Sequence, residues 1–373
     1  MKWFVYILIN IFETLFRFIP IPCKTGIIRI GNPNRNSPVF LTGNFHLTVT
    51  RLKRALSGLD AYLLIANSRG INVWCAATGG LFTNHDVISV LKVSGIEKQV
   101  NHRKVILPQL AGTGIQAAVI KKKTGWQVIW GPAYANDIPE FLENNLNKDA
   151  SMRKTKFTFS QRIEMAVAWA VPISVIVSLV LIPTWKQAIL PLTILTWSIS
   201  LLIFISFPLY KKYFQSNKNF GRGGFQLISW LILMIGLIGY SLFIKPLPLG
   251  IMIRWGVLLS IIVFAITMDI LGCTPIFKSG FHDDRLLQVV LDKNKCKGIG
   301  FCQKVCPGDC FDVDKNKKIA TMPRAENCVQ CGACIVQCPC DALYFRNPKG
   351  EIIAPESIRK FKLNLMGKRM VKV

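Results

Sequence analysis

Four apolar segments divide the middle of the chain and limit the folds that it can adopt. They cover residues 163–182, 188–210, 225–243 and 251–271. Each is about 20 residues long, the length at which a helix crosses the hydrocarbon core of a bilayer. Hydrophobic residues make up 51% of the chain and charged residues only 18%, which favours a membrane protein. We therefore predict a four-helix transmembrane domain over residues 160–272, with membrane lipid as its partner.

The charges beside these segments predict their orientation. Basic residues crowd the flank before the first segment and the loop between the second and third: Arg153, Lys154, Lys156, Arg162, Lys211, Lys212, Lys218 and Arg222. The other two turns carry only Lys186 and Lys245. Because basic loops stay in the cytoplasm, we expect a multi-pass protein of the cytoplasmic membrane whose flanking parts are both cytoplasmic. These basic flanks contribute to the net charge of +26. We do not expect a nucleic-acid partner, because the sequence contains no nucleic-acid recognition motif.

The two ends of the chain are predicted to meet the membrane differently. Residues 1–23 are apolar from Trp3 to Pro20, with large apolar residues at helical spacing. This segment is predicted as an interfacial helix, with a short membrane-spanning helix as the alternative. Residues 349–373 form a basic tail. Residues 358–373 of this tail are predicted to form a solvated or lipid-contacting helix.

Residues 24–150 alternate short apolar runs with helical patterns. Strands are predicted at residues 38–42, 61–65, 104–107 and 126–129, and helices near residues 52–56, 84–94, 114 and 139. Thr83 or Asn84 would cap the second helix and Gly95 would end it. This alternation predicts an α/β domain around a largely parallel sheet. Gly112-Thr-Gly114 has amides that an anion would fit, but a tight turn is the favoured interpretation.

Cysteines are crowded near the C-terminus. Nine of the twelve lie between Cys296 and Cys340, and the others are Cys23, Cys75 and Cys273. A disulfide framework would need an oxidising compartment, whereas metal-binding thiolates agree with a cytoplasmic position. The second run reads Cys328-x2-Cys331-x2-Cys334-x3-Cys338-Pro. This spacing is typical of two-cluster bacterial ferredoxins, and structural zinc is the weaker alternative.

The first run lacks one cysteine of this pattern. It contains Cys296, Cys302 and Cys306-Pro, with Ile299 where a second cysteine is expected. In such ferredoxins the fourth cysteine of each run binds the cluster of the other run. We therefore predict an α+β dicluster ferredoxin domain over residues 285–348.

The crossover rule assigns the ligands unequally. One [4Fe–4S] cluster receives four thiolates: Cys306, Cys328, Cys331 and Cys334. The second cluster receives three: Cys296, Cys302 and Cys338. Three thiolates suit a [3Fe–4S] cluster, or a [4Fe–4S] cluster with an open or replaced corner. Cys310 and Cys340 are the possible replacements, although each follows the proline that redirects the chain.

One further cysteine lies in the α/β part. The segment Asn72-Val-Trp-Cys75-Ala-Ala77 follows a predicted strand and precedes the pair Gly79-Gly80. On composition alone, Cys75 would be a buried and inert thiol.

These residues resemble the cap-helix motif of the corrinoid protein of microbial mercury methylation. The resemblance covers most of residues 24–150 through Gly31-Asn-Pro, Ser37-Pro-Val, Leu59-Asp-Ala-Tyr, Gly70-Ile-Asn-Val-Trp-Cys-Ala-Ala and His102-Arg-Lys-Val-Ile-Leu-Pro-Gln-Leu. The partner of that protein is a dicluster ferredoxin, so the chain looks like a fusion of the two. The corrinoid iron–sulfur protein of acetyl-CoA synthesis is a more distant relative, without a cysteine in its cap.

The resemblance implies that Cys75 is the lower axial ligand of cobalt in a cobalamin-type corrinoid. An external methyl donor or methyltransferase would supply the methyl group. A low-potential electron donor would feed the ferredoxin, which in turn reduces the cobalt. The implied activity is corrinoid-dependent methyl transfer to mercury(II) or another soft acceptor. The remaining cap residues would surround the ring, with small alanines allowing its close approach: Asn72, Val73, Trp74, Ala76 and Ala77.

The chain departs from this family in three places. Thr78-Gly-Gly80 replaces the glycine and lysine that usually follow the cap, and Ile299 interrupts the first run. The chain ends in Met370-Val-Lys-Val instead of paired cysteines. A related methyl transfer without mercury therefore stays open. The alternative from another class is a membrane-anchored iron–sulfur electron-transfer subunit without corrinoid chemistry.

Overall fold

The computed structural model describes residues 3–214, 220–270, 287–364 and 367–370. The chain forms two compact units: residues 1–18 with 157–283, and residues 19–156 with 284–373. The second unit therefore combines the α/β part with the cysteine-rich part, although the helical segments separate them in sequence. Lys218, Cys273 and the last three residues, which enter the sequence predictions, lie outside the described residues.

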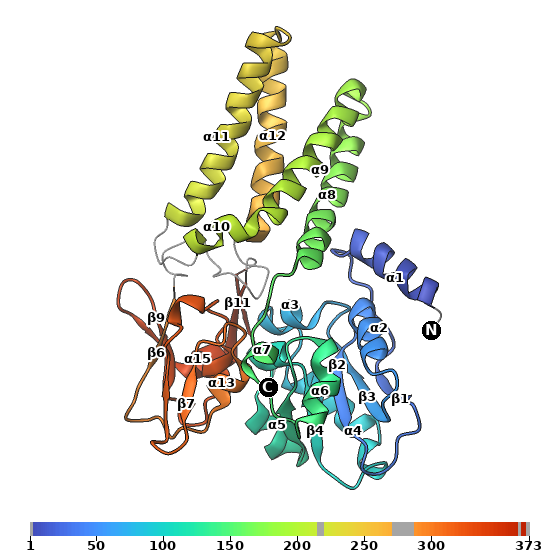
Figure 1. Cartoon of the computed structure of the whole chain (residues 1–373), viewed down its shortest axis with the longest axis vertical. Helices are drawn as coiled ribbons and strands as arrows, with labels where there is room; N and C mark the ends of the chain where they lie inside the picture. The colour runs from blue at the N-terminus through green and yellow to red at the C-terminus, as the bar shows by residue number, and fades with distance from the viewer. Residues whose placement is uncertain (1–2, 215–219, 271–286, 365–366, 371–373) are drawn as a thin grey trace. The chain divides into compact units, whose positions relative to one another are not determined.

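A five-stranded sheet forms the centre of the α/β domain (Figure 1). Its order is β1-β3-β2-β4-β5. The strands are β1 Gly26–Ile30, β2 Val39–Gly43, β3 Ala61–Ala66, β4 Lys104–Leu107 and β5 Gln127–Trp130. Strands β2 to β5 are parallel, as the alternation predicted. The sequence prediction missed β1, an antiparallel edge strand paired with β3.

Helices cover both faces of this sheet. Three of them are α2 His46–Ala55, α4 Asn84–Val93 and α5 Ala117–Thr124. Near the end of the domain lie α6 Ile138–Glu143 and α7 Ala150–Arg153. One face packs against residues of α4 and α5, and the other against residues of α2, α6 and α7. Thr83 is the N-cap of α4, one of the two residues predicted for this position, and it forms a capping box with Asp86.

One helix of this domain begins later than predicted. The segment around Gly114 is the end of a 3-10 helix, η2 Gln109–Thr113, and α5 starts at Ala117. Asn84 Oδ1 accepts a hydrogen bond from the Gln116 N–H at 2.7 Å, which helps to hold this turn.

The cysteine domain, residues 287–353, contains short strands and two one-turn helices. Its helices are α13 Phe301–Val305 and α14 Ala333–Gln337. A three-stranded sheet consists of β6 Gln288–Leu291, β9 Leu343–Arg346 and β10 Ile352–Ile353. A second pair consists of β7 Asp312–Asp314 and β8 Ile319–Thr321.

The basic tail differs from its prediction. Among the tail residues that the structure describes, a helix is present only over α15 Pro355–Lys360. The chain then forms the hairpin of β11 Phe361–Asn364 and β12 Gly367–Met370. The predicted tail helix is therefore wrong over these strands. Antiparallel pairing satisfies the backbone groups that a longer helix would have used.

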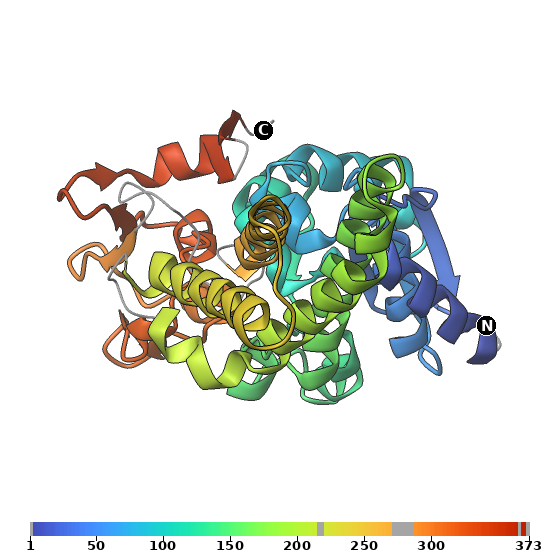
Figure 2. The same cartoon turned by 90° about the horizontal axis from the view of Figure 1, so that it is seen from above.

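In the described residues of the helical unit, α1 is accompanied by five further α-helices (Figures 1 and 2). They are α1 Trp3–Leu15, α8 Phe159–Leu181, α9 Ile189–Ile205, α10 Phe207–Phe214, α11 Phe220–Phe243 and α12 Leu249–Ile270. Within the described residues, four helices are long and apolar enough to cross a membrane: Phe159–Leu181, Lys186–Ile205, Gly224–Phe243 and Leu249–Thr267. An ion pair between Arg17 and Glu164, at 3.0 Å, joins the segment after α1 to α8.

The second apolar segment is not one helix over 188–210. Helix α9 ends at Ile205, and α10 starts at Phe207. Pro208 follows immediately, and proline is tolerated in the first turn of a helix but not in its interior. This proline accounts for the break.

Candidate functional site

The cap helix, α3 Val73–Thr78, carries Cys75 in its first turn. Asn72 is its N-cap, and Asn72 Oδ1 accepts the Cys75 N–H at 2.9 Å. The same side chain donates from Nδ2 to Cys75 Sγ at 3.2 Å. Cys75 is half-buried. One asparagine therefore fixes the helix start and places a hydrogen-bond donor against the sulfur.

The other cap residues divide into two groups. Val73, Ala76 and Ala77 are buried in the core beneath the cap, with exposures of 7%, 0% and 0%. They pack against the sheet, so the expectation that the alanines face a bound ring does not fit this structure. Helical spacing explains the difference, because positions 73, 76 and 77 share one face of a helix. Asn72, Trp74 and Cys75 stay half-buried on the other side.

Gly112 in η2 and Gly114 directly after it explain how the cap is supported. A Cβ atom on Gly114 would lie 2.5 Å from Phe82 O and 2.9 Å from Ala77 Cα. Only glycine allows the chain to pass this closely beneath the cap helix. A Cβ atom on Gly112 would contact Val305 at 3.4 Å and Ala333 at 3.8 Å, both in the cysteine domain. The favoured interpretation of this motif as a turn agrees with these contacts.

Four cysteines gather in one place of the cysteine domain, which we call the four-cysteine site: Cys306, Cys328, Cys331 and Cys334. Burial raises the pKa of Cys331, and the charges of Cys306 and Cys328 raise it further. Burial and the charges of Cys306, Cys331 and Cys328 likewise raise the pKa of Cys334. Thiolates held this closely repel one another, so the set is suited to cations such as the irons of a cluster.

Cys310 is a fifth cysteine at the four-cysteine site. It is fully buried, and its N–H donates to Cys306 Sγ at 3.3 Å. Hydrogen bonds between its thiol and the sulfurs of Cys306 and Cys328 raise the pKa of Cys310. The same contact with Cys310 lowers the pKa of Cys306. The geometry makes Cys310 a hydrogen-bond donor to two predicted ligands.

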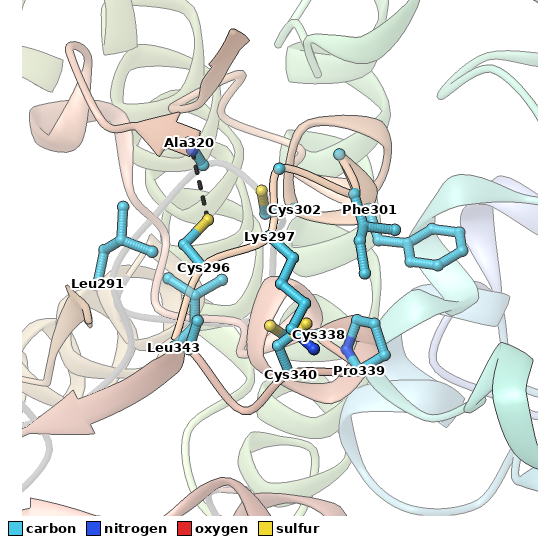
Figure 3. A pocket seen from close by; sticks show the side chains of 14 residues that line it. Leu291, Cys296, Lys297, Phe301, Cys302, Ala320, Cys338, Pro339, Cys340 and Leu343 are labelled. Atoms are coloured by element: carbon cyan, nitrogen blue, oxygen red, sulfur yellow. Dashed lines mark hydrogen bonds between the residues drawn. The ribbon is translucent and has the colours of Figure 1, made fainter. Parts of the chain in front are cut away.

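Four cysteines line a pocket that opens to solvent (Figure 3): Cys296, Cys302, Cys338 and Cys340. The first three are the predicted ligands of the second cluster, and we call these three the pocket site. Burial raises the pKa of Cys302 to about 12, and the charges of Cys338 and Cys296 contribute. The Ala320 N–H donates to Cys296 Sγ at 3.4 Å. The structure thus brings the predicted ligands together in two sets, divided as the crossover rule divides them.

The two sets suit clusters better than single ions. Within the described ranges, no three histidine, cysteine or acidic side chains converge closely enough to hold one metal ion. Zinc needs its ligands at about 2.3 Å from a single centre. A cubane cluster is held by thiolates on separate iron atoms, so its ligands lie further apart.

Buried polar contacts join the cysteine domain to the α/β domain. Gln337 Nε2 donates to Gly112 O at 2.8 Å and also to Ile115 O, and Gln337 Oε1 accepts the Ala117 N–H at 3.2 Å. Lys148 Nζ donates to Gln109 Oε1 at 2.6 Å and to Lys304 O at 2.7 Å. These contacts link α14 and α13 to η2, which lies directly beneath the cap.

An ion pair supports the same interface. Arg153 Nε lies 3.0 Å from Asp309 Oδ1, and both side chains are largely buried. The Thr155 N–H donates to Pro307 O at 2.8 Å. These contacts could not be predicted, because no local pattern in the sequence shows that residues 156 positions apart, such as Arg153 and Asp309, meet.

Comparison with known proteins relates one part of the chain to a family. The family described as CO dehydrogenase/acetyl-CoA synthase delta subunit matches residues 12–142. Acetyl-CoA decarbonylase/synthase complex subunit gamma of Archaeoglobus fulgidus is 36% identical over 128 residues, which cover 34% of this chain and 27% of that protein. The subunit of the same name from Methanopyrus kandleri is 36% identical over 129 residues, covering 33% and 27%.

A bacterial relative carries a different name. The corrinoid/iron–sulfur protein large subunit of Moorella thermoacetica is 30% identical over 130 residues, covering 34% of this chain and 29% of that protein. The chain therefore spans less than a third of the length of these curated relatives. The matched residues include the sheet and the cap helix but neither cysteine run. The α/β domain of this chain is thus related to corrinoid iron–sulfur protein subunits of the acetyl-CoA synthase complex.

Proposed function

We propose that the chain is a membrane-anchored corrinoid protein with a fused dicluster ferredoxin, and that it acts in methyl transfer. The observation that carries the proposal is the half-buried Cys75 thiol, presented by the cap of a domain related to corrinoid proteins. A bound corrinoid would supply a cobalt ion that accepts and releases a methyl group.

The chain's own residues suit this group. Cys75 would bind cobalt from the cap side, and an anionic sulfur is a stronger electron donor than a neutral imidazole. Asn72 would keep the sulfur oriented, since it donates to Sγ at 3.2 Å while it also caps the helix. Trp74 is half-buried beside Cys75 and offers an aromatic surface at the edge of the site. The buried Ala76 and Ala77 hold the cap on the sheet.

The fused cysteine domain would deliver electrons to the cobalt. Val305 and Ala333 belong to the same buried cluster as the core of the α/β domain, and Cys331 packs against that cluster. The four-cysteine site thus has a ligand beside the domain that carries the cap. The pocket site opens to solvent and is lined only by cysteine-domain residues. We therefore expect an external low-potential donor to reduce the pocket cluster first.

The helical unit would anchor both soluble parts to the membrane. In the apolar windows of its four long helices, between 6% and 39% of residues are buried inside the structure. Uncovered apolar surface of this extent favours contact with lipid. With the basic flanks described above, the cytoplasmic face of the cytoplasmic membrane is the proposed location of both soluble parts.

The methyl donor and the acceptor are expected to be external. The relatives are named as subunits of a complex, which supports a protein partner such as a methyltransferase. The cap motif supports mercury(II) as the acceptor. Thr78-Gly-Gly80, which departs from the usual continuation of that motif, supports another soft acceptor.

A visible spectrum tests the corrinoid part of the proposal. The full chain, expressed with cobalamin and purified in detergent, should show a corrin band that changes or disappears in Cys75→Ala. Cys23→Ala, which removes another half-buried cysteine of the same domain, should leave the band unchanged. Iron–sulfur absorption without any corrin band would refute the proposal and favour an electron-transfer subunit.

A second experiment decides the acceptor. The loaded protein is incubated anaerobically with mercuric ion and a methyl source, and methylmercury is measured. A corrin band without methylmercury would refute mercury as the acceptor and support the related methyl transfer.

A further inference from the structure

The two cysteine runs fold into the same local structure. Gly298 and Gln330 have φ angles of 63° and 56°, and Gly300 and Gly332 have φ angles of 85° and 73°. Helices α13 and α14 end at Cys306 and Cys338 with ψ angles of 115° and 113°. Asp309 and Asp341 follow with φ angles of 50° and 51°. Each position of one run therefore has an equivalent in the other.

This equivalence identifies the residue that stands in place of the missing cysteine ligand. Ile299 takes the position of Cys331, as both precede the equivalent glycines 300 and 332. Its side chain is 48% exposed and lines the pocket, where it offers no atom that can bind iron. The pocket site consequently lacks the thiolate that Cys331 supplies to the four-cysteine site.

The second run has an additional cysteine at another position. Cys340 is the equivalent of Gly308. A Cβ atom on Gly308 would run toward the four-cysteine site, at 2.3 Å from Asn327 O and 3.1 Å from Cys310 Sγ. The same direction at Cys340 leads to the pocket site, where its side chain lines the pocket with Cys338 (Figure 3).

The other spare cysteine belongs elsewhere. Cys310 is fully buried at the four-cysteine site, whose ligand set is already complete. Its equivalent in the second run is Ala342, which lines the pocket. Of the two additional cysteines, Cys340 is the one that the fold places at the incomplete site.

We propose that Cys340 is the fourth thiolate ligand of the cluster at the pocket site, which is therefore [4Fe–4S]. On ligation the thiol releases its proton to solvent, and Sγ forms a bond with the fourth iron. No iron changes its oxidation state in this step. The inference rests on the cluster part of the proposed function and is independent of the corrinoid.

Electron paramagnetic resonance and iron analysis of the full-length protein test this ligand. An oxidised [3Fe–4S] cluster is paramagnetic and an oxidised [4Fe–4S] cluster is not. We expect about eight irons and no such signal in the wild type, as two cubanes require. Cys340→Ala should lose about one iron and gain the [3Fe–4S] signal. Cys310→Ala, which removes the additional cysteine of the other site, should gain no signal.

A rescue variant separates ligation from folding. Ile299→Cys, introduced into the Cys340→Ala protein, restores a thiol at the position equivalent to Cys331. It should remove the signal and return the iron content to the wild-type value, even if Cys340→Ala alone loses the whole pocket cluster. Failure of this rescue would overturn the inference.

The remaining outcomes are also decisive. A [3Fe–4S] signal in the wild type that persists in Cys340→Ala would overturn the role of Cys340 alone. So would the absence of a signal from both proteins when Cys340→Ala keeps the iron content of the wild type. A wild type that binds no iron would refute the proposed ferredoxin together with this inference.

Discussion

Gln337 is a buried polar side chain that joins the cysteine domain to the α/β domain. It is 6% exposed and makes three hydrogen bonds to backbone groups of Gly112, Ile115 and Ala117. Gln337→Leu keeps a similar volume but leaves these groups without their partners. At about 1 kcal/mol of net stability for each hydrogen bond, the loss is about 3 kcal/mol.

The expected effect is measurable as a thermal shift. The unit that contains Gln337 comprises residues 19–156 and 284–373. For domains of about 150–250 residues, 1 kcal/mol corresponds to about 2–4 °C in Tm, so Gln337→Leu should lower Tm by about 6–12 °C. The assay is a thermal scan of the full chain in detergent, followed by tryptophan fluorescence and by cluster absorbance.

A matched variant controls for the substitution itself. Gln303→Leu changes a half-buried glutamine on α13 in the same way. Its Tm should change by less than about 2 °C, as is usual for substitutions away from buried polar networks. Equal shifts for the two variants would refute the role assigned to the Gln337 hydrogen bonds.

Three further substitutions test the cap and the interface. Asn72→Ala removes the N-cap of α3 and should lower the stability by about 1 kcal/mol in a thermal scan. It should also shift the corrin band, and an unchanged band would argue against the contact between Asn72 and the Cys75 sulfur. Gly114→Ala forces a Cβ atom toward Phe82 O and should cost about 1–3 kcal/mol; a neutral effect on Tm would contradict the close approach. Arg153→Met removes the 3.0 Å ion-pair partner of the buried Asp309 and should lower the stability by about 1–3 kcal/mol in the same scan. An unchanged Tm would show that Arg324 alone is enough to stabilise the Asp309 carboxylate.

Local patterns in the sequence determined most of the elements that carry the site. Strands β2, β3 and β4 were predicted to within about a residue, because buried parallel strands are short continuous apolar runs. The sequence narrowed the N-cap of α4 to Thr83 or Asn84, because a capping residue directly precedes a run of helical periodicity. The division of the cysteines into two sets followed from their spacing, since a two-residue loop restricts where the next thiolate can reach.

Only the tertiary structure showed which side chains of the cap are accessible and which cysteine lies at which site. It showed that Ala76 and Ala77 pack inward and leave Asn72, Trp74 and Cys75 at the edge of the cap. The sequence contains no periodic signal for the Gln337 contacts, which join residues more than 200 positions apart. Sequence spacing alone also gave Cys310 and Cys340 equal standing. Packing distinguishes them, because it places Cys310 at the four-cysteine site and Cys340 in the pocket that holds the three predicted ligands of the pocket site.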